Sequence, residues 1–170
     1  MDRLPEAFAA PGYLSEDWDR IPVPAHWVLE GEGAYGAPIY TNVQFPFPCE
    51  PPFVPDANPT GDYRRTFTVP ESFSGTRGAP ADRVLLRFDG VESRYKVWLN
   101  GVEIGVGSGS RLVQEFDVSQ ALKAGENVLA VRVHQWSVAS YLEDQDQWWL
   151  QGIFRSVTLE VRPVGGIDDL

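Results

Sequence analysis

The chain has 170 residues, a net charge of −10 and a single cysteine. Its length predicts one domain with a hydrophobic core, and its 43% hydrophobic and 22% charged residues are typical of globular proteins. The negative charge disfavours nucleic acid and anionic membrane surfaces as partners, since both attract clustered lysine and arginine. One cysteine excludes an internal disulfide, and no apolar run reaches the ~20 residues of a membrane-spanning helix. The N-terminus also lacks the apolar core of a signal peptide, so we expect a cytoplasmic protein.

The N-terminal third of the chain has little regular pattern. Residues 1–20 are polar, and we expect a loosely ordered arm there. Between residue 21 and Gly61, recurrent prolines forbid long helices and central strands. We therefore predict a long covering loop with one short edge strand near Val43–Phe45. Asn58–Gly61 fits a type I turn, with proline at the second position and glycine at the fourth.

Alternating apolar residues follow that turn. The sequence Asn100-Gly101 between two such runs is a strong signal for a β-hairpin. The predicted strands are Tyr63–Val69, Val84–Phe88, Tyr95–Leu99, Val102–Val106, Glu115–Val118, Asn127–Gln135 and Val157–Val161. Short strands joined by turns predict an all-β, antiparallel β-sandwich over residues 21–163, followed by a tail at 164–170. Periodicity leaves a jelly roll and an immunoglobulin-like sandwich as alternatives.

One later segment, Ser140–Val157, combines acidic and aromatic side chains. Its acids are Glu143, Asp144 and Asp146, and its adjacent tryptophans are Trp148 and Trp149. A carboxylate accepts hydrogen bonds from sugar hydroxyls, and an indole ring packs on the apolar face of a pyranose. The segment therefore suits sugar recognition. A polar loop with aromatic core anchors is an equally good interpretation of the same residues.

The same segment resembles the motif that closes the N-terminal jelly-roll domain of family 2 glycoside hydrolases, above all the bacterial β-galactosidases. Three stretches between residues 18 and 162 carry the resemblance. They are Tyr141–Asp146 with Trp148 and Gly152–Arg155; Ala37–Val43 with Pro51–Pro55 and Asn58–Gly61; and Ser110–Leu112 with Glu115–Asp117. The resemblance implies a galactose-binding-domain-like jelly roll.

The resemblance also implies roles for single residues. Catalysis in the family belongs to a downstream (β/α)8 barrel, so we expect no catalytic residue in this chain, although the local acids could be imagined as a catalytic pair. The positions that match substrate-binding residues of the family are Asn42 and Asp146. Asp146 is further expected to hold a sodium ion, but only together with the barrel, because a hard cation needs several oxygen ligands. We expect no cofactor in this chain alone, and sodium and magnesium in the intact parent enzyme.

We therefore expect the non-catalytic sugar-binding domain of a family 2 β-galactosidase. Its expected partners are a β-galactoside and the catalytic barrel, and the parent's expected activity is retaining hydrolysis of terminal β-D-galactosides in lactose metabolism. A stand-alone carbohydrate-binding module or lectin-like domain is the alternative. Assembly into a homo-oligomer stays open, because the N-terminal arm that contributes to it in tetrameric family members is short here.

Plain structural roles compete with these assignments. Asn42 would then be a turn residue that caps backbone groups, and Asp146 a loop acid paired with Arg155. We predict that Asp146 is partly exposed at one end of the sandwich, since an unpaired buried carboxylate is costly. Arg111 and Glu115 are interpreted as an ion pair. The tryptophans expected in the core or at its rim are Trp27, Trp98 and Trp136.

Overall fold

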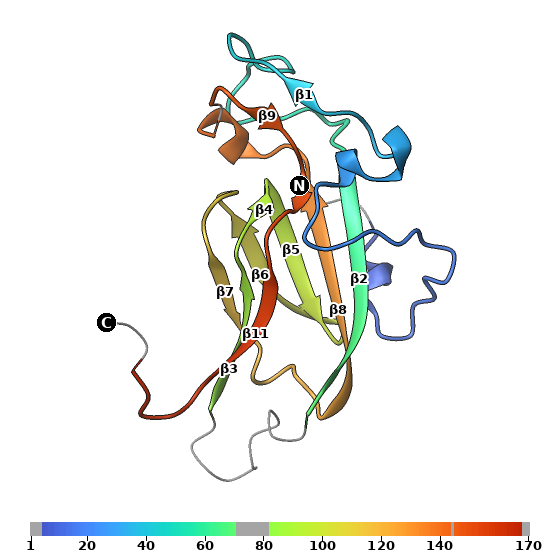
Figure 1. Ribbon diagram of the computed structural model, residues 1–170, viewed down its shortest axis with the longest axis vertical. Helices are drawn as coiled ribbons and strands as arrows, with labels where there is room; N and C mark the ends of the chain where they lie inside the picture. The colour runs from blue at the N-terminus through green and yellow to red at the C-terminus, as the bar shows by residue number, and fades with distance from the viewer. Residues whose placement is uncertain (1–4, 71–81, 144, 168–170) are drawn as a thin grey trace.

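The computed structural model describes residues 5–70, 82–143 and 145–167. Two antiparallel sheets face each other as a β-sandwich (Figure 1), as predicted. The larger sheet has the order β2 (Thr60–Val69), β8 (Gly125–His134), β5 (Arg94–Leu99), β6 (Val102–Ser108). The smaller has the order β11 (Val157–Arg162), β3 (Arg83–Phe88), β7 (Gln114–Asp117). Among the described residues, no helix is long and apolar enough to cross a membrane.

Short elements complete the chain. Two-stranded pairs are β1 (Ile39–Tyr40) with β9 (Trp148–Trp149), and β4 (Val91–Glu92) with β10 (Gly152–Ile153). The 3-10 turns are η1 (Ala7–Ala9), η2 (Trp27–Leu29), η3 (Gly31–Gly33) and η5 (Val138–Tyr141). Each predicted main strand is present within a few residues of its expected bounds.

The core lies between the two sheets, where the alternation of apolar residues placed it. From β3, Val84, Leu86 and Phe88 face inward, and Val131 and Val133 of β8 belong to the same buried cluster. The three tryptophans expected in the core or at its rim, Trp27, Trp98 and Trp136, are buried. Burial of this apolar surface is the main term that holds the sandwich together.

The predicted hairpin at Asn100-Gly101 is confirmed. Both residues have positive φ angles, 55° and 81°, which suit the tight turn between β5 and β6. The Asn100 side chain also accepts a hydrogen bond from the Val128 amide at 3.0 Å and donates one to Asn127 Oδ1 at 2.8 Å. The turn is therefore tied to the start of β8 as well as to its own hairpin.

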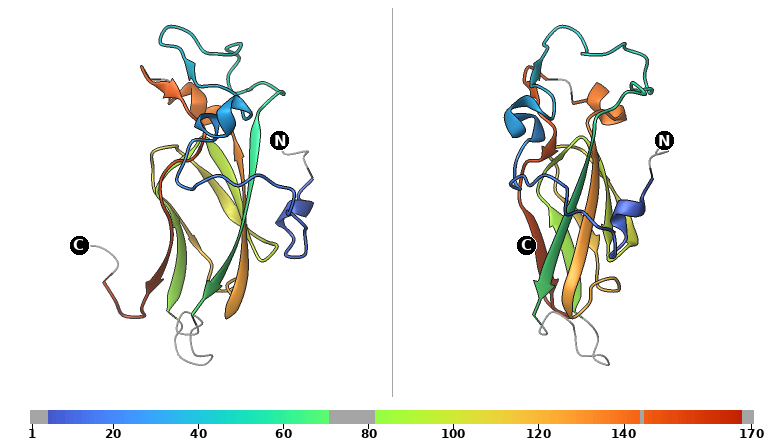
Figure 2. Two further views of the ribbon diagram at one scale, coloured as in Figure 1. Left: turned by 45° about the vertical axis from the view of Figure 1, so that its right-hand side comes forward. Right: turned by 90° about the vertical axis from the view of Figure 1, so that its right-hand side faces the viewer.

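The N-terminal segment packs beside the larger sheet (Figure 2). Phe8 and Ala9 are buried in a second apolar cluster with Trp98 and Ala130. Arg64 of β2 holds the segment by donating hydrogen bonds to the carbonyl oxygens of residues 8 and 11, both at 2.7 Å. The expectation of a loose arm is therefore wrong over this part, because periodicity within the segment does not reveal the sheet face that receives it.

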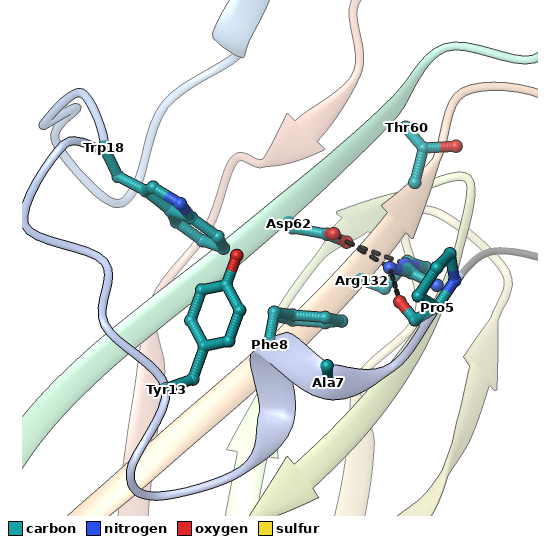
Figure 3. Close-up of a pocket in the computed structure, with 8 residues that line it drawn as sticks. All are labelled: Pro5, Ala7, Phe8, Tyr13, Trp18, Thr60, Asp62 and Arg132. Carbon is teal, nitrogen blue, oxygen red and sulfur yellow. Dashed lines mark hydrogen bonds and ion pairs between the residues drawn. The ribbon is translucent and has the colours of Figure 1, made fainter.

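A second arginine fixes the same segment. Arg132 is buried and forms two contacts with the carboxylate of Asp62, at 2.7 and 2.9 Å, and a third with the Pro5 carbonyl oxygen at 2.8 Å. Its guanidinium lies 4.8 Å from the centroid of the Phe8 ring. These groups line a hollow (Figure 3), which has a volume of about 260 Å³. Since this guanidinium and carboxylate already pair with each other, the hollow is part of the segment's seat rather than a candidate sugar site.

Three local predictions are wrong. The type I turn expected at Asn58–Gly61 is not formed, because Thr60 and Gly61 already belong to β2 and pair with His134 and Val133. The edge strand expected near Val43–Phe45 forms earlier, at β1, and Val43 is 88% exposed in a bend. Prolines beyond the bend cannot donate backbone hydrogen bonds, so they do not extend the ladder. Arg111 pairs with Glu92 at 3.2 Å, not with Glu115. Glu115 faces Arg87 across the β7–β3 ladder, whereas Arg111 remains in the loop before β7.

Glu92 is a buried acid where β4 meets β10. It is 3% exposed, with Arg111 as its ion-pair partner. Burial raises the pKa of Glu92 to about 7, even though the nearby Arg111 guanidinium lowers it, and the Glu143 carboxylate raises it further. Desolvation thus outweighs the single, partly exposed ion pair.

Substitution of Phe8 tests the packing of the N-terminal segment. Phe8→Ala should lower the free energy of unfolding by about 2–4 kcal/mol, because it removes a buried ring against the sheet. Leu14→Ala is the control on the same segment, since Leu14 is 79% exposed, and should change stability by less than ~0.5 kcal/mol. Urea unfolding measures both. Equal midpoints for the two variants would contradict the packing.

The raised pKa of Glu92 predicts a pH dependence of stability. The folded chain holds this proton more tightly than the unfolded chain, whose glutamates have the ordinary value of 4.5. The stability that protonated Glu92 contributes is fully present below pH 4.5 and is lost as the pH rises towards 7. The free energy of unfolding should fall by about 3 kcal/mol over this range. Denaturant unfolding at several pH values should show this slope in the wild type and in Glu103→Gln, an exposed control, but not in Glu92→Gln. An unchanged slope in Glu92→Gln would refute the assignment.

Candidate functional site

The candidate sugar-binding residues meet at one end of the sandwich, at the top of Figure 1. There β1 pairs with β9 in antiparallel register, so that Ile39 lies opposite Trp149 and Tyr40 opposite Trp148. Asn42 follows β1 closely and Asp146 precedes β9. The ladder therefore brings to one place two segments that lie 106 residues apart in the sequence.

Asp146 is exposed on the loop before β9, as predicted. The Tyr40 hydroxyl donates a hydrogen bond to its Oδ1. That bond also raises the pKa of Tyr40 above its ordinary value. Arg155 instead donates to the carbonyl oxygens of Asp89 and Arg111, at 3.5 and 3.4 Å, so the alternative of an Asp146–Arg155 ion pair is not found among the described residues.

Asn42 lies exposed in the bend that follows β1. The neighbouring Thr41 Oγ1 accepts a hydrogen bond of 2.9 Å from the Trp149 indole, which fixes the backbone beside Asn42 to β9. Within the described parts of the chain, no hydrogen bond occupies the Asn42 amide. The Asn42 side chain therefore does not cap backbone groups in this structure, and its amide is available to a ligand.

The two adjacent tryptophans have different roles. Trp149 is 6% exposed, and its ring meets the Trp136 ring edge-on with centroids 5.3 Å apart. Trp148 is 54% exposed, and its ring lies 5.4 Å from the Tyr40 ring. Because neighbouring residues on a strand point to opposite faces, one tryptophan anchors the loop and the other faces outward. The interpretation as a core anchor is confirmed for Trp149, whereas sugar recognition by the exposed Trp148 stays a prediction.

The two described acids of this segment, Glu143 and Asp146, lie in different surroundings. Glu143 turns toward the sandwich, where its carboxylate accepts hydrogen bonds from the Ser110 amide at 2.8 Å and the Ser110 hydroxyl at 2.5 Å. Ser110 is fully buried, so Glu143 serves as a tether for the loop. Asp144 lies outside the described residues. Glu143 and Asp146 thus have different tasks, one structural and one available to a ligand.

The broad loop between β1 and β2 is held by aromatic contacts. Tyr141 of η5 donates a hydrogen bond to the Phe53 carbonyl oxygen at 2.5 Å and accepts one from the Glu50 amide at 3.2 Å. The Phe47 ring lies 5.6 Å from the Tyr141 ring and 5.0 Å from the Trp136 ring. The proline-rich loop is therefore packed onto the end of the sandwich, beside the candidate site.

Metal binding by this chain alone has little support. The described residues include no group of three or more His, Cys, Asp or Glu side chains that could hold a metal ion. Asp146 has one carboxylate oxygen bonded to Tyr40, which leaves its Oδ2 for a cation. A hard cation needs several further oxygen ligands, so these residues fit a sodium ion only as one part of a larger site.

The sequence did not reveal the roles of Tyr40 and Glu143. Tyr40 lay within a matched stretch but carried no assigned role, and Glu143 was grouped with the other acids. Pairing between β1 and β9 is set by strands of two residues each, which are too short for an alternation pattern to reveal.

Comparison with known proteins agrees with the fold. Residues 6–163 match the family model of the glycosyl hydrolases family 2, sugar binding domain. The β-galactosidase of Arthrobacter sp. (strain B7) is 69% identical over 97% of this chain, and that of Vibrio vulnificus (strain CMCP6) is 48% identical over 96%. The chain spans only 16% and 15% of the length of these two relatives.

Solved structures show the same architecture. A Bacteroides uniformis β-glucuronidase superposes with a TM-score of 0.67 over 95% of this chain and 16% of its own, at 22% sequence identity. This likeness concerns the fold. Because the family model covers nearly the whole sandwich and the N-terminal segment, the chain belongs to the sugar-binding domain family of the family 2 glycosyl hydrolases.

Proposed function

We propose that this chain is the non-catalytic sugar-binding domain of a cytoplasmic β-galactosidase that hydrolyses terminal β-D-galactosides. The observation that carries the proposal is the junction of β1 and β9, which places Asn42 and Asp146 together and exposed at one end of the sandwich. The names of the similar Arthrobacter and Vibrio proteins support galactosides as the substrate class. The small share of those relatives that this chain covers supports a catalytic barrel elsewhere in the polypeptide.

The two residues complement each other chemically. The Asn42 amide offers a donor and an acceptor, and the Asp146 carboxylate offers acceptors, which together match the hydroxyl groups of a galactosyl unit. Asp146 Oδ2, which has no hydrogen bond within the described residues, is also an oxygen that this site would contribute to a sodium ion bound jointly with the barrel. Magnesium in the intact enzyme remains an expectation that rests on the resemblance.

Docking of the barrel would use the same end of the sandwich. Apolar side chains there are largely exposed, namely Val43, Phe53 and Leu142. A partner surface that covers them would bury apolar area, and it would close the sugar site from the side that this chain leaves open.

The proposal predicts a division between stability and activity at Asp146. The purified chain should not hydrolyse a chromogenic galactoside. Asp146→Ala should change its free energy of unfolding by less than ~0.5 kcal/mol, because the side chain is exposed. In the full-length enzyme the same change should lower kcat/KM by about 10- to 100-fold, as expected for a lost hydrogen bond to a charged group.

Glu143→Ala is the matched control on the same loop. It leaves the buried Ser110 donors unpaired and should cost about 1–3 kcal/mol of stability in the isolated chain. A large loss of stability in Asp146→Ala, or hydrolysis by the purified chain that Asp146→Asn abolishes, would overturn the proposal.

A stand-alone carbohydrate-binding module is the second candidate. The observation in its favour is the exposed Trp148 ring beside Tyr40 and Asp146, since aromatic faces with adjacent carboxylates bind pyranoses. Against it, Asn42 and Asp146 offer contacts on one side of a sugar only.

Calorimetric titration of the isolated chain separates the two candidates. A half-site should bind galactose and lactose more weakly than about 1 mM, because few contacts must offset the loss of ligand freedom. A self-sufficient module should bind more tightly and lose that binding in Trp148→Ala. Trp18→Ala, a change on the distant N-terminal segment, is the control for nonspecific effects.

A further inference from the structure

The loop that carries Asp146 is fixed at both of its ends. At the start, Glu143 is bonded to the backbone and side chain of the buried Ser110. At the end, Trp149 is buried and its indole donates to Thr41. Anchored residues therefore lie on either side of Asp146, whose own side chain is exposed.

Tyr40 provides the contact that restrains this side chain. Within the described residues, its hydroxyl is the hydrogen-bond partner of the Asp146 carboxylate, and it occupies Oδ1. Tyr40 is itself set by its register opposite Trp148 and by the contact between their rings, 5.4 Å apart. The phenol is thus a placed donor on a strand, not a mobile group on a loop.

We propose that Tyr40 is a positioning residue, whose hydroxyl orients the Asp146 carboxylate so that Oδ2 points toward the ligand beside Asn42. The inference rests on the proposed function, because it needs Asp146 to contact the sugar or its cation. A carboxylate without this restraint would sample several rotamers, and ordering it on binding would cost free energy. Because the fold already holds Tyr40 in place, its hydrogen bond orders the Asp146 carboxylate before the ligand binds. Tyr40 does this without touching the substrate itself.

The contact can be tested first in the isolated chain. At about pH 10 an ordinary tyrosine is half ionised, and its tyrosinate absorbance is easily measured. The tyrosinate absorbance due to Tyr40 is the absorbance of a chain minus that of the same chain carrying Tyr40→Phe. This difference should be small in the wild type, where Asp146 suppresses ionisation, and should rise toward the ordinary value in the Asp146→Asn background.

Tyr141→Phe is the control in this titration, because its hydroxyl bonds to the Phe53 and Glu50 backbone at the same end of the domain. Removing it should leave the ionisation of Tyr40 unchanged. If Tyr40 ionises equally with and without the Asp146 carboxylate, the contact does not exist in solution and the inference is overturned.

The consequence for binding is tested in the full-length enzyme. Tyr40→Phe should lower kcat/KM for a galactoside by about three- to tenfold, the effect of one neutral hydrogen bond, with an unchanged melting temperature. The double variant Tyr40→Phe/Asp146→Asn should be no worse than Asp146→Asn alone, since Tyr40 acts through Asp146. Tyr13→Phe, on the N-terminal segment, should behave as the wild type.

The possible results separate the two proposals. If Asp146→Asn has no effect on kcat/KM, the proposed function of Asp146 fails and the role of Tyr40 fails with it. If Asp146→Asn is severely impaired while Tyr40→Phe is fully active, or if the two effects add in the double variant, only the positioning role is refuted.

Discussion

The candidate site depends on the two-residue ladder between β1 and β9. It joins the proline-rich first part of the chain to the acidic segment before the last strand, and each candidate ligand-binding residue lies next to one of its strands. Short ladders are weak by themselves, so this one is stabilised from both sides. Trp149 is buried against Trp136, and its indole bonds to Thr41. The site is therefore a product of the aromatic packing beneath it.

Buried polar contacts hold the loops around this ladder. Glu143 satisfies two donors of Ser110, and Arg111, the next residue, pairs with the buried Glu92. Such contacts are costly to leave unmade, which favours one loop arrangement over its alternatives. Asp146, by contrast, remains exposed, and its hydrogen-bond partner among the described residues is Tyr40. Under the proposed function, structural and ligand-binding tasks are thus divided between acids that lie close together in the sequence.

The N-terminal segment shows the same physics on another face. Its apolar side chains cover Trp98, and two arginines from the sheet bind its backbone carbonyl oxygens. An arginine offers several donors in a fixed fork, so it can fix an irregular segment that has no ladder of its own. The region where the N-terminal segment contacts the sheet lies away from the candidate sugar site. Arg132 and Asp62 in this region already pair with each other, so its role is structural.

The sequence alone determined the sandwich, its main strands, the hairpin at Asn100 and the inward faces of the strands, because alternation and turn chemistry are local properties. A family resemblance pointed to Asn42 and Asp146, and alternation had no means of doing so. Only the tertiary structure decided which tryptophan is buried, which acid is a tether, and that Arg111 pairs with Glu92. These outcomes depend on contacts between segments far apart in the chain, and side-chain spacing within one segment carries no information about them.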